Sequence, residues 1–129
     1  MNYWIFQYTT TIYKNVIKDL DSGKLKRWEV TKHRKNIKVG DKVILYIGGE
    51  GAKFIYGTAK ISSEIFQIED GRYFIALEEI ERLPEKVSLH RAKKDIPTLK
   101  IGISGTNFSC SEEEYTKIKE YPKGVFFLI

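Results

Sequence analysis

Residues 38–61 constrain the fold of this chain more than any other stretch. Two apolar segments, residues 43–47 and 54–56, lie on either side of a glycine-rich bend at residues 48–51. β-Branched and aromatic residues on both sides of such a bend predict a β-hairpin. Gly57 follows the second segment, where a missing side chain indicates a bulge or the close approach of another group. We expect this hairpin to form the floor of a pocket whose walls are aromatic residues from elsewhere in the chain.

Length and composition indicate one domain in a reducing compartment. With 129 residues, we expect residues 1–129 to form a single domain whose core needs no cross-links. The one cysteine, Cys110, cannot form an internal disulfide and fits a cytoplasmic setting. No apolar run approaches the roughly 18 residues that span a bilayer, so we expect no membrane partner.

Positive charge is concentrated in residues 24–42, the basic run, which surrounds Trp28. Its cationic residues and histidine are Lys24, Lys26, Arg27, Lys32, His33, Arg34, Lys35, Lys38 and Lys42. The net charge of +5 is compatible with a polyanionic partner. A solvated basic surface is one interpretation of the run. The aromatic side chain in its middle favours the other, a patch that contacts the phosphates of a nucleic acid.

The other residues predict a β-rich fold with few helices. Strands are expected at 3–8, 25–30, 61–68, 72–83 and 125–129, with Pro84 ending the strand that begins at residue 72. Helical spacing predicts a helix at 12–20, capped by a hydroxyl from residues 9–11, and allows a helical turn within 87–96. Ser111 and Glu114 form a capping box for a last helix, and residues 102–107 indicate a turn-rich loop. We therefore predict an α+β fold, a small, mostly antiparallel β-barrel with peripheral helices.

No group of residues with catalytic spacing is evident. His33 and His90 are far apart and have no ligand spacing around them, so we expect no metal. Cys110 has no evident activating partner. We therefore expect neither enzymatic activity nor a cofactor, and keep a small enzyme on a related barrel as a third hypothesis.

Four blocks of the sequence together resemble the EVE domain of the PUA-like superfamily and its YTH relatives. They are YWIFQ at residues 3–7, RWEV at 27–30, the hairpin block at 37–61, and LKIGISGTNFSCSEEEYTKI at 99–118. The resemblance implies a PUA-like barrel that is not an enzyme and that holds one flipped-out, usually methylated, base in an aromatic pocket. Related domains lie at the N-termini of modification-dependent restriction GTPases, which implies fusion to, or association with, a nuclease or GTPase subunit as one context.

The same resemblance indicates where the base would bind. Trp28 lies where YTH domains place the first tryptophan of their methyl cage, and Phe66 stands in for the second. The complete predicted base-binding pocket is Trp28, Tyr8, Thr9, Tyr46, Phe66, Ser104 and Asn107. Tyr46 comes from the hairpin and either lines the pocket or fills the barrel. Trp28 is either the stacking face of the pocket or a core residue, and its position in the basic run favours the pocket.

Phosphate binding is predicted for Arg27, Lys32, His33, Arg34 and Lys35 beside the mouth of the pocket. The favoured function is a reader of a modified base on DNA, in a restriction or defence context. The alternative is an RNA-binding PUA-like module that acts on tRNA, rRNA or single-stranded RNA.

Overall fold

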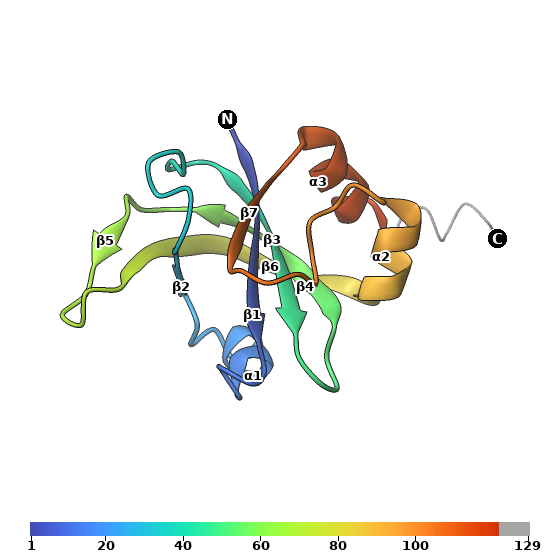
Figure 1. Cartoon of the computed structure of the whole chain (residues 1–129), viewed down its shortest axis with the longest axis horizontal. Helices are drawn as coiled ribbons and strands as arrows, with labels where there is room; N and C mark the ends of the chain where they lie inside the picture. The colour runs from blue at the N-terminus through green and yellow to red at the C-terminus, as the bar shows by residue number, and fades with distance from the viewer. Residues whose placement is uncertain (122–129) are drawn as a thin grey trace.

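A mixed β-sheet, curled into a half-barrel, forms the body of the protein in this computed structural model, which describes residues 1–121 (Figure 1). Its strands are β1 (Tyr3–Thr9), β2 (Arg27–Glu29), β3 (Lys42–Gly48), β4 (Phe54–Ile61), β5 (Phe66–Gln67), β6 (Tyr73–Ser88) and β7 (Asn107–Cys110). The helices of the described residues are α1 (Val16–Asp21), α2 (Leu89–Asp95) and α3 (Glu112–Lys119). The strand predicted at 125–129 lies outside the described residues.

The strand order is β2-β6-β4-β3-β1-β7, and β5 pairs with β6. Only β1 and β3 run parallel among the described strands, and the other pairs are antiparallel. The predicted α+β class and the mostly antiparallel sheet are therefore confirmed.

The hairpin at residues 38–61 is confirmed as β3 and β4, which lie in the middle of the sheet. The close approach predicted at Gly57 is also confirmed. A Cβ atom at this position would overlap the carbonyl oxygen of Glu81 on β6, and the register shifts on both sides of Gly57. Glycine is required here because β6 packs directly against the backbone of β4.

The prediction that Pro84 ends its strand is wrong, because β6 continues to Ser88. On β4, Gly57 pairs with Arg82 and Ile55 with Val87, so Pro84 falls in an interval where β6 has extra residues. Proline has no N–H to donate to the ladder, and an irregular interval of this kind tolerates it.

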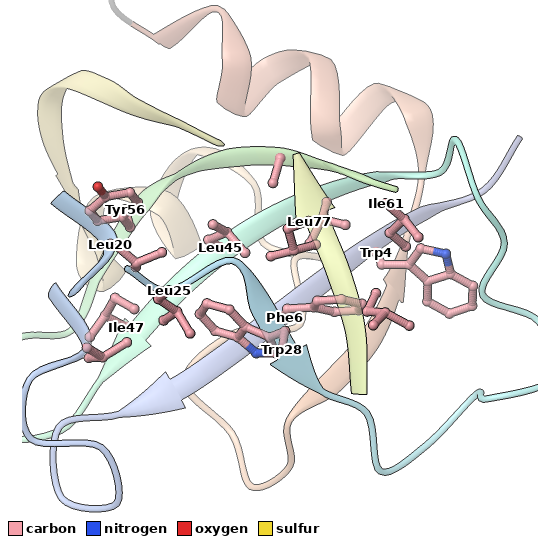
Figure 2. Close-up of a cluster of buried hydrophobic side chains, with 14 of the residues drawn as sticks. Trp4, Phe6, Leu20, Leu25, Trp28, Leu45, Ile47, Tyr56, Ile61 and Leu77 are labelled. Atoms are coloured by element: carbon pink, nitrogen blue, oxygen red, sulfur yellow. The ribbon is translucent and has the colours of Figure 1, made fainter. Parts of the chain in front are cut away.

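Two apolar clusters lie on opposite faces of the sheet because side chains alternate along a strand. Val43, Leu45 and Ile47 of β3 belong to the first cluster, together with Trp28 of β2 (Figure 2). Ile44 and Tyr46 belong to the second cluster, which α2 and α3 cover. Tyr46 therefore fills the core and does not share a face with Trp28, so its prediction as a pocket residue is wrong.

The first helix is shorter than predicted. It begins at Val16, its N-cap residue Asn15 makes no side-chain capping bond, and Ile12 is 84% exposed rather than on an apolar face. The backbone N–H groups of Ile12 and Tyr13 both donate to the carbonyl of Thr9, so the residues after β1 form a turn instead of a helix.

The C-terminal half contains one confirmed motif and one missed strand. Ser111 and Glu114 form the predicted capping box at the start of α3. β7 was not predicted, because Gly102 and Gly105 beside it indicate a loop. Its register is set by pairing with β1, a contact that spans most of the chain and leaves no local pattern.

Candidate nucleic-acid interface

A groove of about 630 Å³ opens beside β2 and the first half of β6. It combines aromatic rings with positive charge and is called the aromatic groove below. Its lining residues are Tyr8, Tyr13, Lys24, Leu25, Lys26, Arg27, Phe66, Arg72, Phe74 and Ala76.

The sheet register explains why aromatic and cationic side chains meet here. Arg27 of β2 lies opposite Ala76 of β6, and Phe66 of β5 lies opposite Phe74. Trp28 and its partner on β6, Ile75, lie at the alternate positions of these strands, and both are fully buried. Because alternate residues point to opposite faces, this arrangement turns rings and cations toward the groove.

Two arginines lie against the ring of Phe74. The guanidinium carbon of Arg27 is 4.7 Å from the ring centroid and that of Arg72 is 5.3 Å away. Arg72 is also held by the carboxylates of Asp70 at 2.7 Å and Glu29 at 3.5 Å. Arg27 forms no ion pair with a carboxylate of residues 1–121, so its charge is free for an anionic ligand.

Tyr8 joins the groove to the core. Its ring stacks on Trp28, with centroids 4.1 Å apart and planes 11° from parallel. The Glu29 backbone N–H donates to its hydroxyl oxygen at 2.8 Å. Burial raises the pKa of Tyr8 to about 12, so the hydroxyl keeps its proton at neutral pH and can still donate it.

Trp28 does not line the aromatic groove. Its side chain is 0% exposed and packs in the first apolar cluster (Figure 2), and the Tyr8 ring stacks on it. The expectation that this ring faces an open pocket is therefore wrong. The physical reason is alternation along β2: Arg27 and Glu29 point outward and carry the charge, while Trp28 between them points inward. The indole N–H has no hydrogen-bond partner among the described residues.

Asn107 of β7 is fully buried, and its side chain forms hydrogen bonds to the backbone of residues 29 and 31. Its side-chain oxygen accepts the Thr31 backbone N–H at 2.8 Å, and its amide nitrogen donates to the Glu29 carbonyl at 3.4 Å. Thr9 accepts hydrogen bonds from the turn after β1. Ser104 is exposed in the loop before β7. Of the predicted pocket residues, only Tyr8 and Phe66 lie together in the groove.

Gln7 is a positioning residue that the sequence reasoning missed. Its side-chain amide is buried and donates to the carbonyls of Ile103 and Gly105, at 2.6 Å for the latter. It thereby holds the loop before β7 against β1. A single polar residue within the otherwise apolar start of β1 was the available signal.

The predicted phosphate-binding residues divide into two groups. Arg27 lines the groove, whereas residues 32–35 are exposed in the segment after β2 and do not line it. Arg34 stacks on Tyr73, 4.0 Å from the ring centroid. His33 has a positive φ of 61° and lies 5.3 Å from the Trp4 ring. Their phosphate contacts stay predictions.

Other groove residues were not predicted as site residues. They are Tyr13, Lys24, Leu25, Lys26, Arg72, Phe74 and Ala76. The two lysines belong to the basic run, which was the available signal for them. Phe74 could not be assigned because its place in the groove depends on pairing between β6 and two other short strands.

Within residues 1–121, no three His, Cys, Asp or Glu side chains gather as metal ligands would. Burial raises the pKa of the Cys110 thiol to about 12, which makes it a weak nucleophile at neutral pH. No helix in this part of the chain is long and apolar enough to cross a membrane.

Comparison with known proteins identifies a family and a fold. The family model of the EVE domain matches residues 2–121. A search of curated proteins found no match. A solved structure of a protein from Agrobacterium tumefaciens is 18% identical, with a TM-score of 0.71 over 94% of this chain and 92% of that one. A hypothetical protein from Leishmania major is 16% identical, with a TM-score of 0.72 and 96% of each chain covered. The ASCH protein from Zymomonas mobilis is 12% identical, with a TM-score of 0.65 over 91% of this chain and 93% of that one.

Proposed function

Because this chain belongs to the EVE domain family, we propose that its aromatic groove binds one base of a nucleic acid that has left the base stack. EVE domains are generally nucleic-acid-binding. The observation that carries the proposal is the meeting of four aromatic rings and four cations in one groove of about 630 Å³.

The rings supply what an unstacked base loses. Removing a base from a duplex costs a few kcal/mol of stacking and pairing. Stacking on an aromatic side chain returns roughly 1–3 kcal/mol per base. Tyr8 lines the groove with Trp28 packed beneath it, so Trp28 supports the stacking surface without forming it. This replaces the predicted direct role of Trp28 in the pocket.

The cations supply affinity for the backbone on either side of that base. Lys24, Lys26 and Arg27 line the groove and are exposed. Cations that neutralise phosphates release bound counterions, so binding should weaken steeply with salt. Such contacts position the strand without reading its sequence.

The favoured ligand is DNA with a modified, methylated base, read in a restriction or defence context together with a nuclease or GTPase subunit. The domain itself would bind without catalysing a reaction. RNA is the second candidate, because rings and cations of this kind also fit the unstacked bases and phosphates of single-stranded tRNA, rRNA or other RNA.

A binding panel tests the proposal. Duplex DNA with one modified base, the same duplex unmodified, and single-stranded RNA of the same sequence would be titrated against the wild type and Phe66→Ala. Phe66 lines the groove and is 37% exposed, so its loss should leave the fold intact. We expect the variant to lose about 1–3 kcal/mol of binding to the preferred ligand, or roughly 5- to 150-fold.

The matched control is Val39→Ala, which removes another exposed apolar side chain, 54% exposed and outside the groove. It should bind as the wild type does. Equal binding by Phe66→Ala and the wild type would refute the groove as the base site. A preference for RNA with no response to DNA modification would select the second candidate.

A further inference from the structure

A second groove lies between the β3–β4 loop and the start of α2, and is called the α2 groove below. Its volume is about 700 Å³. Its lining residues are Ala52, Lys53, Ser88, Leu89, His90, Lys93 and Lys94, so it contains three lysines and no acidic side chain.

The two sides of the α2 groove are fixed to each other. The Leu89 backbone N–H donates to the Lys53 carbonyl at 2.9 Å, which ties the loop to the first residue of α2. Lys53 has a positive φ of 62°, a conformation that a non-glycine residue keeps only where surrounding contacts enforce it. Ser88 caps α2 by accepting the Arg91 N–H at 3.1 Å. The backbone of Lys53 is therefore held in place beside the helix that carries the other two lysines.

Positive charge in the α2 groove is largely uncompensated. Lys53 and Lys94 are exposed, and neither forms an ion pair with a carboxylate of residues 1–121. Lys93 donates to the carbonyl of Leu99 at 2.6 Å and is partly engaged. Ala52 and Leu89 contribute the apolar part of the lining. A sugar-phosphate backbone fits this combination, because its anionic oxygens suit the lysines and its sugars suit an apolar lining.

One strand connects the two grooves. Phe74 near the start of β6 lines the aromatic groove, and Ser88 at its end lines the α2 groove. In Figure 1, β6 crosses between β5 and α2, which lie toward opposite ends of the long axis. At about 3.3 Å per residue, this length of strand spans at most about 46 Å. The rise of duplex DNA is about 3.4 Å per base pair, so about 13 base pairs would cover that span.

We propose that the α2 groove binds the phosphate backbone of the same nucleic acid whose base enters the aromatic groove, at most about a dozen base pairs away. The proposal rests on the proposed function for its ligand. It adds a second contact that makes affinity depend on the length of the nucleic acid.

The test uses Lys53→Gln/Lys94→Gln, with Lys18→Gln/Lys100→Gln as a control pair that removes the same charge from exposed positions outside both grooves and outside the basic run. Both pairs and the wild type would be titrated with 8- and 20-base-pair DNA duplexes that carry one methylated base near one end. Single-stranded RNAs of 8 and 20 nucleotides form a parallel series.

We expect the groove pair to lose about tenfold in affinity for the 20-mer and almost nothing for the 8-mer. Its salt slope on the 20-mer should fall by about 2, because each lost phosphate contact removes about 0.9. The control pair should keep the wild-type length dependence. Thermal melting by circular dichroism would confirm that all proteins are folded.

Equal losses in the groove pair and the control pair would overturn the proposal, since they would reflect bulk charge alone. A wild type that binds neither 20-mer would overturn it together with the proposed function. If poly-glutamate binds more tightly than either 20-mer, and the Lys53→Gln/Lys94→Gln pair weakens that binding, the groove would be assigned to an acidic protein instead. If Phe66→Ala has no effect while the groove pair still weakens the 20-mer, the proposed function fails and the α2 groove stands.

Discussion

At the scale of single residues, Tyr8 is where the core and the aromatic groove meet. The Tyr8 ring stacks on the fully buried Trp28 ring, and the Tyr8 hydroxyl oxygen accepts a hydrogen bond from the Glu29 N–H. These contacts hold the Tyr8 ring rigid at the edge of the groove, so the side chain has little conformational entropy to lose when a ligand binds. The rigidity depends on Trp28, which makes Trp28 important to the site although it lies outside it.

The replacement Trp28→Ala tests this supporting role. The side chain is 0% exposed, so its loss should cost about 3–5 kcal/mol in the free energy of unfolding. Urea denaturation measures the change, and Phe66→Ala is the control because that ring is partly exposed. A near-normal stability with lost base discrimination would instead restore Trp28 as a pocket residue.

At the scale of elements, the contact between β4 and β6 decides the shape of the sheet. β6 pairs with β2 and β5 near its start and with β4 along the rest of its length. The same strand therefore builds the aromatic groove and joins it to the centre of the sheet. The irregular pairing around Gly57 and Pro84 bends β6.

Gly57→Ala should break this contact. The added methyl group would overlap the Glu81 carbonyl, and backbone cannot move aside as a side chain can. We expect a loss of about 3 kcal/mol or more in the free energy of unfolding, at or above the usual range for overpacking. Gly48→Ala in the same hairpin is the control, because its methyl group would meet only near-ordinary contacts, the nearest at 3.4 Å. Similar stability of the two variants would contradict the structure.

At the scale of the whole molecule, several tyrosines are coupled to folding. Burial raises the pKa of Tyr8 and Tyr56 to about 12. The pKa of Tyr13 is raised to about 12 by its hydrogen bond to the Asp19 carboxylate. In the unfolded chain a tyrosine ionises near pH 10. Between about pH 10 and 12 the folded protein therefore keeps protons that the unfolded chain has lost.

This difference predicts how stability depends on pH. Because the unfolded state binds fewer protons in that window, the free energy of unfolding should fall as pH rises from about 10 to 12. At pH 7–9 these tyrosines are protonated in both the folded and the unfolded state, so the free energy of unfolding should not depend on them. Urea denaturation at pH 8 and 11 measures the effect, and Tyr8→Phe should reduce the difference. A wild-type stability that stays constant across this range would contradict the raised pKa values.

Much of the fold was predictable because its signals are local. The hairpin follows from two apolar segments around a glycine-rich bend, and the capping box from two residues three positions apart. Gly57 indicated the close approach of another strand because a residue without a side chain interrupts the apolar segment. The four sequence blocks also identified the family correctly.

Local patterns in the chain therefore specify the class of the fold, the central hairpin and a basic surface beside aromatic residues. Local patterns cannot specify which rings meet in the groove, because Tyr8, Phe66 and Phe74 come from three strands whose pairing is long-range. The long-range pairing also places Trp28 and Tyr46 in opposite halves of the core. The physical reason is that facing depends on strand register, and a register shift of one residue moves every side chain to the other face.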